Sequence, residues 1–232
     1  MKLQYYIVLF ILIGKYVMKS YFVSDAKFLM LDIPVPYIEM LNEAKMLKSR
    51  FTAHRGYGDF HKGWKSLALH GLGEDKHENW DEYGYKSAAE ASADYHWTTA
   101  ANECPVTLDF LQNVFPCKRY GRVRFMLLEA GGWIGLHSDT KHRLLENINI
   151  PLSNPKECIW QWGDGEELFM EPGVPYAMNI SYEHKIVNNS NEDRFHIIIA
   201  RHDSTDDWRT LMDQAADKAN VTGHYVLHEI AT

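Results

Sequence analysis

The stretch from Gly121 to Asp203 consists of short apolar runs separated by turn-forming residues. The runs are shorter than a typical helix, and glycine, proline, asparagine and aspartate interrupt the chain between them. We therefore predict seven β-strands, at residues 122–129, 146–152, 157–162, 167–170, 175–180, 184–188 and 194–201. Many short strands with turns between them indicate a mainly β fold with flanking helices, in a sandwich or barrel of the jelly-roll type.

The rest of the chain predicts a helical cover for this β-region. Apolar residues at helical spacing predict helices at 36–48, 88–93, 105–115 and 206–219, and one further strand is expected at 64–70. Residues 25–36 suit an edge strand or an extended segment because two prolines interrupt them. We expect a single domain over 21–232, with a helical and loop cover at 21–120, a β-barrel core at 121–203 and a C-terminal helix within 204–232.

Charge and cysteine usage exclude some functions. The formal net charge is −7 and no run of Lys or Arg occurs, which argues against a nucleic-acid partner. Cys104, Cys117 and Cys158 form no CxxC pair, so neither a zinc knuckle nor a disulfide framework is indicated, and the pattern fits a reducing compartment. We expect a cytoplasmic protein.

The first 20 residues contain an apolar run that Lys15 interrupts. A spanning helix needs about 20 apolar residues, so no stable membrane span is expected. The run has the length of a signal-peptide core, but no A-x-A-like site follows it. The alternatives to a signal peptide are that the run is a buried strand or that it is an extension of a chain that starts at Met18.

Two histidines and one aspartate in the β-region have the spacing of metal ligands. His137 and Asp139 lie two residues apart, so they point to the same side of an extended segment, and His184 from a later strand could complete the set. Two histidines and one carboxylate that leave open positions are the ligand set of non-haem Fe(II) oxygenases.

Arg194 is the second unusual feature of this region. It precedes a very apolar run, where a charge is costly unless it is paired. A bidentate carboxylate on a bound ligand would pair it well. The alternative is an arginine at a strand end, bonded to Glu192, Asp193 or solvent.

The motifs together resemble one known family. They are Gly121–Gly132 with its sequence GRVRFMLLEAGG, the HSD tripeptide at 137–139, NINIPL at 147–152, HKIVNNS at 184–190, and Arg194, with a weaker echo in CPVT at 104–107. This pattern resembles the aspartyl/asparaginyl β-hydroxylase family of Fe(II)- and 2-oxoglutarate-dependent oxygenases, which are built on a double-stranded β-helix. The resemblance covers roughly the C-terminal half of the chain.

The resemblance implies a set of roles. His137, Asp139 and His184 would bind Fe(II), and Arg194 would hold the distal carboxylate of 2-oxoglutarate. Arg124 and Asn149 are candidates for cofactor binding on other grounds: they lie on segments that adjoin these ligands, where they contact the cosubstrate or substrate or are rim or packing residues. The implied reaction consumes O2 and 2-oxoglutarate, releases succinate and CO2, and hydroxylates an amino acid, free or within a peptide. The animal protein hydroxylases of this family lack the carboxylate ligand, so Asp139 makes this chain more similar to bacterial and small-molecule hydroxylases.

Other residues are less decisive, and other functions stay open. Either site contact or packing is possible for Trp133, Arg143 and Asn147. A hydrogen bond is a simpler role than metal ligation for His142, His196 and His202. A core or a cleft would be lined by Trp160 and Trp162, and a substrate pocket could be completed by Trp64, His70 and Trp97. A cupin-like metal-dependent isomerase or ligand-binding protein is the main alternative, since such a protein needs no cation for a dicarboxylate. A structural β-barrel with incidental histidines is the other.

Overall fold

The computed structural model describes residues 16–54, 60–74, 80–203 and 205–231, so the apolar run near the N-terminus lies outside the described residues. The strands are β1 (Tyr16–Val23), β2 (Phe28–Met30), β3 (Thr52–Ala53), β4 (His61–Gly71), β5 (His96–Trp97), β6 (Tyr120–His137), β7 (Leu145–Pro151), β8 (Cys158–Trp162), β9 (Glu167–Leu168), β10 (Tyr176–Asn179), β11 (His184–Asn188), β12 (Arg194–Arg201) and β13 (His224–Ala231). The helices are α2 (Tyr37–Met46), α3 (Ala88–Ala93), α4 (Thr99–Asn102), α5 (Pro105–Asp109) and α6 (Asp206–Ala219), with a 3-10 turn, η1 (Lys48–Arg50), and a π turn, η2 (Phe110–Val114). Among these residues, no helix is both long enough and apolar enough to cross a membrane.

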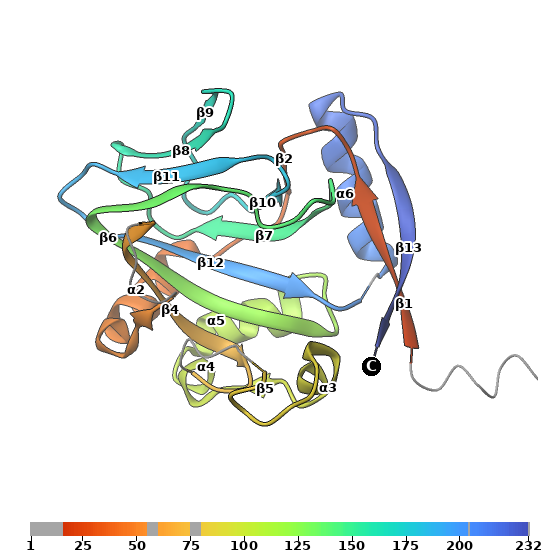
Figure 1. Ribbon diagram of the computed structural model, residues 1–232, viewed down its shortest axis with the longest axis horizontal. Helices are drawn as coiled ribbons and strands as arrows, with labels where there is room; N and C mark the ends of the chain where they lie inside the picture. The colour runs from red at the N-terminus through yellow and green to blue at the C-terminus, as the bar shows by residue number, and fades with distance from the viewer. Residues whose placement is uncertain (1–15, 55–59, 75–79, 204, 232) are drawn as a thin grey trace, which may run out of the picture.

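The main sheet curls into two layers. Its strands follow the order β2-β10-β7-β12-β6-β11-β8-β9, and β3, β4 and β5 attach beside β6. The first part of β6 pairs with β12, whereas its last residues pair with β11. Figure 1 shows β8, β9 and β11 as a layer facing β7, β10 and β12, with α2, α4 and α5 outside the sheet. This arrangement confirms the expected mainly β, double-stranded β-helix fold.

Strand β6 is longer than the sequence predicts. The strand expected at 122–129 was bounded by Gly131 and Gly132, but the chain bends there and remains in the sheet as far as His137. Gly131 has φ +65°, which favours glycine, and a Cβ on Gly132 would lie 2.7 Å from the carbonyl oxygen of Glu129. The two glycines therefore bend one strand from the first layer into the second.

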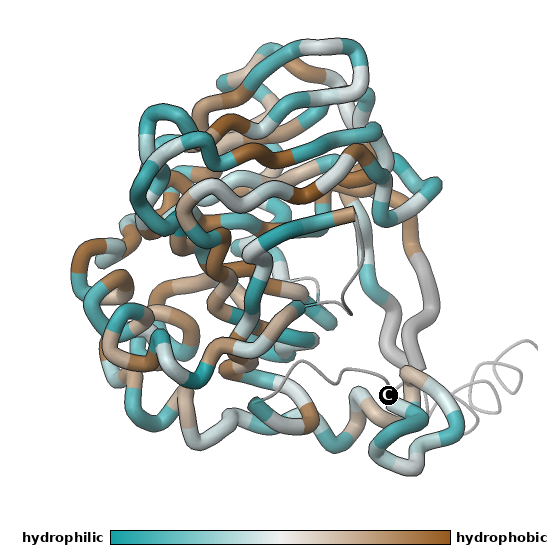
Figure 2. Tube along the Cα trace, turned by 60° about the vertical axis from the view of Figure 1, so that its left-hand side comes forward, coloured by the Kyte–Doolittle hydropathy of each residue, from teal (hydrophilic) through white to brown (hydrophobic). Residues whose placement is uncertain are grey.

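Apolar and polar side chains alternate along the strands, so the two faces of the sheet differ in polarity. On β6, Val123, Phe125 and Leu127 join the main apolar core beneath the helices, whereas Arg122 and Arg124 line a cavity on the opposite face. Strands β7 and β12 repeat this pattern, and Figure 2 shows hydrophobic and hydrophilic residues alternating along the strands. Strands β6, β7 and β12 therefore direct apolar residues to the core under the helices and mainly polar residues to the cavity.

The helical cover agrees with the sequence in outline. The helices expected at 36–48, 88–93 and 206–219 correspond to α2, α3 and α6. The helix expected at 105–115 is α5 followed by the π turn η2. The buried Glu43 of α2 accepts hydrogen bonds from the backbone N–H groups of Val106 and Thr107, so its carboxylate satisfies free donors at the start of α5.

A two-stranded sheet of β1 and β13 lies beside α6 (Figure 1). The sequence predicts the helix in 204–232 but not β13, which follows it. Lys19 on β1 forms a 2.7 Å ion pair with Glu146 and donates to the carbonyl oxygen of Arg201 at 2.5 Å. The Arg201 guanidinium lies 3.7 Å from the centre of the Trp208 ring. These buried contacts attach β1 and α6 to the end of the barrel.

Two Asn-x-Ser segments fix strand ends: one begins at the last residue of β10 and the other at the last residue of β11. In both, the asparagine side-chain oxygen accepts from the backbone N–H and the hydroxyl of the serine two residues later, as Asn188 does with Ser190 at 3.2 and 2.6 Å and Asn179 with Ser181. The Asn188 amide nitrogen also donates to the carbonyl oxygens of Leu128, Glu129 and Glu192. Both asparagines are fully buried, so their side chains replace backbone pairing where the strands end.

Substituting Asn188 by alanine is predicted to destabilise the fold strongly. The change leaves buried carbonyl and N–H groups of the turn without partners, which costs about 2–4 kcal/mol in the free energy of unfolding. Chemical denaturation measures the loss. The exposed neighbour Asn189 is the matched control, and its alanine variant is expected to change stability by no more than about 0.5 kcal/mol. Equal effects of the two substitutions would contradict this role for Asn188.

Candidate functional site

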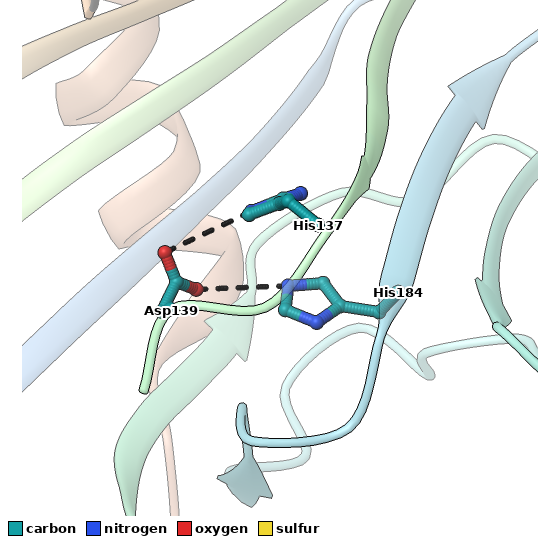
Figure 3. Close-up of side chains that lie close together, drawn as sticks. All are labelled: His137, Asp139 and His184. Carbon is teal, nitrogen blue, oxygen red and sulfur yellow. Dashed lines mark ion pairs between the residues drawn. The ribbon is translucent and has the colours of Figure 1, made fainter. Parts of the chain in front are cut away.

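Three side chains converge where β6 ends and β11 begins (Figure 3). His137 and His184 face each other as cross-strand partners of these two strands. Asp139 follows β6 in a loop and is held there by its backbone N–H, which donates to the carbonyl oxygen of Ile180 at 3.0 Å. One ligand atom from each of the three residues lies within 4.8 Å of the others. The structure therefore brings together all three residues that the sequence proposes as ligands.

Both imidazoles present the same nitrogen to the centre of this group. His137 Nδ1 donates to the carbonyl oxygen of Gly135 at 2.8 Å, and His184 Nδ1 donates to that of Tyr182 at 2.9 Å. In a neutral ring the proton is then on Nδ1, and Nε2 keeps a free lone pair. The Nε2 atoms lie 3.8 and 3.7 Å from the two carboxylate oxygens of Asp139. Metal-bound histidines commonly show this arrangement, in which a backbone carbonyl fixes the ring and its tautomer.

Burial keeps His184 neutral. The side chain is 2% exposed, and loss of solvation lowers its pKa below the ordinary histidine value, although the hydrogen bond to the Tyr182 carbonyl and the charge of Asp139 oppose this shift. The Trp160 ring stacks flat on the imidazole at 4.5 Å between centroids. His184 is therefore both deprotonated at neutral pH and fixed in position, as metal ligation requires.

Arg194 lies in the same cavity and is 2% exposed. Its Nε donates to Asn154 Oδ1 at 2.8 Å, one terminal nitrogen donates to His196 Nδ1 at 2.9 Å, and the other to the Met170 sulfur at 3.3 Å. All three acceptors are neutral, and no carboxylate of the described chain forms an ion pair with Arg194. Burial accordingly lowers the pKa of this guanidinium. The contacts with Glu192, Asp193 or solvent considered from the sequence are not the ones observed.

A cavity of about 460 Å³ connects the three ligands to Arg194. Its described lining residues are His54, Trp64, Arg122, Arg124, Ile134, His137, Asp139, Asn147, Asn149, Trp160, Ile180, His184, Ile186, Arg194, His196 and Ile198. This size accommodates a small organic molecule. Among these residues Asp139 is the one acid, whereas three are arginines, so the cavity favours anionic ligands.

The structure separates the less decisive candidates into two groups. Arg124, Asn147, Asn149, Trp160 and Trp64 line the cavity. Several others lie elsewhere. Arg143 and His142 are exposed, and Arg143 forms an ion pair with Asp25. The rings of His70 and Trp97 pack on each other with 4.7 Å between their centroids. The described lining also lacks Trp133, Trp162 and His202.

The sequence alone did not single out two lining residues, His54 and Arg122, or two hydrogen-bond partners of Arg194, Asn154 and Met170. Arg122 could have been found, because it alternates with apolar residues in the same way as Arg124. Asn154 and Met170 come from loops that carry no such period. Their contact with Arg194 depends on how those loops fold back.

Comparison with protein families gives one match. The family model described as Aspartyl/Asparaginyl beta-hydroxylase matches residues 37–202, which is more than half of the chain. The match includes all three candidate ligands and Arg194. A comparison with curated protein sequences found no match.

Solved structures that match this chain include two prolyl hydroxylases and one oxidoreductase. A Pseudomonas putida prolyl-4-hydroxylase is 11% identical, with 78% of this chain and 95% of that chain covered and a TM-score of 0.42. A Burkholderia pseudomallei oxidoreductase of the 2OG-Fe(II) oxygenase family is 10% identical, with 78% and 88% covered and a TM-score of 0.45. A Trichoplax adhaerens prolyl hydroxylase, in complex with a hypoxia inducible factor peptide fragment, is 12% identical, with 81% and 87% covered and a TM-score of 0.44. At these identities the likeness gives no information on substrate.

The three converging side chains are predicted to bind a divalent metal. Removing one ligand by His184→Ala should weaken Mn(II) binding by more than about 100-fold, since even the loss of a group that only supports a ligand costs 10–100-fold. Titration calorimetry with Mn(II) measures the change. His142→Ala, at an exposed histidine close to Asp139 in sequence, is the control and should bind Mn(II) as tightly as the unsubstituted protein. Unchanged binding by His184→Ala would refute this ligand set.

Proposed function

Because this chain belongs to the aspartyl/asparaginyl β-hydroxylase family, we propose that it is an Fe(II)- and 2-oxoglutarate-dependent dioxygenase. Its substrate is an amino acid, free or as a side chain within a peptide. In the balanced reaction one oxygen atom of O2 enters the substrate as a hydroxyl group. The other oxygen atom enters succinate, as 2-oxoglutarate loses CO2.

The observation that carries this proposal is the pairing of two features in one cavity. His137, Asp139 and His184 form a two-histidine, one-carboxylate set, which leaves open positions on a metal. Arg194 supplies a buried positive charge whose described partners are all neutral. A metal site alone would fit many barrel proteins, but a buried guanidinium in the same cavity specifically fits a cosubstrate with a second carboxylate.

The ligand residues would hold and orient the metal. The hydrogen bonds from His137 and His184 to backbone carbonyls keep both Nε2 lone pairs directed at it. Asp139 contributes the one negative charge and lies toward the more exposed side of the site. Fe(II) bound there would supply a chelating centre for the 2-oxo acid and the electrons for O2 activation.

The cavity walls would position the cosubstrate and exclude water. Arg194 would bind the distal carboxylate by donating the N–H groups that its three neutral partners leave available. On the metal side the lining includes Ile134, Trp160 and Ile186, which are buried and apolar. These side chains would keep the reacting C–H group in a low-dielectric region and limit unproductive side reactions.

Arg194→Gln is predicted to separate cosubstrate binding from metal binding. Loss of a buried charge that pairs with a carboxylate typically costs at least 2 kcal/mol, so we expect the concentration of 2-oxoglutarate for half-maximal succinate formation to rise by about 30-fold or more. Mn(II) affinity should not change. Fe(II)-dependent succinate formation and calorimetry give the two values, and Arg143→Gln, at an exposed arginine, is the control.

The same measurements distinguish the alternative function. A cupin-like isomerase or ligand-binding protein has no use for a distal carboxylate, so metal-loaded protein that fails to bind 2-oxoglutarate would refute the oxygenase assignment. Succinate formation that is equal with and without Arg194 would refute the role of this residue alone.

A further inference from the structure

His196 lies beside Arg194 on the inner wall of the barrel and is 4% exposed. The pairing register of β12 gives the order in which the polar residues follow one another along this wall. Arg194 pairs with Leu128 of β6, His196 with Met126, and Ile198 with Arg124. On the other side of β12, Ile198 pairs with Asn149. His196 therefore occupies the row between Arg194 and the row that contains Arg124 and Asn149.

The hydrogen bond to Arg194 fixes the tautomer of His196. An arginine side chain can only donate, so the Nδ1 atom that meets it at 2.9 Å is an acceptor. In a neutral ring the proton is then on Nε2. This is the opposite tautomer from that of His137 and His184, whose Nδ1 atoms donate. The described chain provides no hydrogen-bond acceptor for Nε2, although the ring lines the cavity.

The surroundings keep this ring neutral and favour an anion next to it. Burial, followed by the charges of Arg194 and Arg124 and the proximity of His54, holds the pKa of His196 well below the ordinary histidine value. No carboxylate contributes to this shift. Asp139, at the metal site, is the one acid among the described residues of the cavity wall. An N–H donor in such surroundings is suited to a carboxylate acceptor.

The geometry of the ring separates this donor from the cosubstrate carboxylate. Nδ1 and Nε2 point away from each other across an imidazole, so a carboxylate that contacts Arg194 near Nδ1 cannot also accept from Nε2–H. The acceptor for Nε2–H must lie on the other side of the ring. Along β12, the row of the wall beyond His196 and away from Arg194 contains Arg124 and Asn149.

We propose that His196 is a specificity-determining residue, which donates its Nε2–H to a carboxylate of the substrate while its Nδ1 orients the arginine that binds 2-oxoglutarate. The inference rests on the proposed function, because it assigns the Arg194 side of the ring to the cosubstrate. It narrows the substrate to molecules with a free carboxylate, such as a free amino acid. An internal peptide residue with a neutral side chain does not satisfy it.

His196→Asn separates the two roles of the ring. The asparagine oxygen takes the place of Nδ1 and can still accept from Arg194, whereas the amide does not reach the position of Nε2. In protein loaded with Zn(II) and 2-oxoglutarate, acetate serves as a minimal carboxylate probe and acetamide as its neutral counterpart. We expect acetate to shift the Nε2–H resonance of His196 in the NMR spectrum and acetamide not to do so. In His196→Asn, acetate binding should weaken by about tenfold or more, with 2-oxoglutarate affinity changed less than threefold.

The possible results of this experiment distinguish failure of the inference from failure of the proposed function. His224→Asn, at an exposed histidine of β13, should bind acetate like the unsubstituted protein. A resonance that responds to 2-oxoglutarate and not to acetate would overturn the inference, because the donor would then belong to the cosubstrate. Absence of any response in the unsubstituted protein would also overturn it, whether or not the variant folds. Failure of metal-loaded protein to bind 2-oxoglutarate would refute the proposed function, and the inference with it.

Discussion

The pairing of β11 with the end of β6 is the constraint on which the site depends. It places His184 opposite His137, and a shift of one residue would turn one of these imidazoles to the other face of the sheet. Two features hold the register: the bend at Gly131 and Gly132, which brings β6 into the second layer, and the buried Asn-x-Ser turns at the ends of β10 and β11. The family motif at 188–190 therefore has a structural role, since it fixes the strand that carries a candidate ligand.

Electrostatics connect the fold to the proposed chemistry. The cost of burying Arg194 is met within the described chain only by neutral acceptors, and an unpaired buried charge is expensive. An anion bound next to the Arg194 guanidinium would offset the cost of burying this charge. Asp139 provides the opposite charge at the candidate metal site, so the cavity is polarised from this carboxylate to the guanidinium groups on the inner wall.

Much of this structure could be predicted from sequence because its signals are local. Short apolar runs predict the strands, and those at 184–188 and 194–201 have the observed bounds. Spacing and family motifs together predict the convergence of His137, Asp139 and His184. The long-range features could not be read in this way. The continuation of β6 through two glycines, the pairing of β1 with β13, and the contacts of Asn154 and Met170 with Arg194 all join segments whose own sequences carry no signal for the partner. The tautomer of His196 likewise depends on a neighbour's hydrogen bond.

The most direct test of the account is anaerobic absorption spectroscopy of the Fe(II)-loaded protein during titration with 2-oxoglutarate. Chelation of Fe(II) by a 2-oxo acid produces a visible charge-transfer band, and it requires two adjacent open positions on the metal. We expect this band to appear and to saturate with one equivalent of 2-oxoglutarate per protein. Fe(II)-loaded protein that develops no band at saturating 2-oxoglutarate would contradict the central claim that the three ligands and Arg194 form one cosubstrate site.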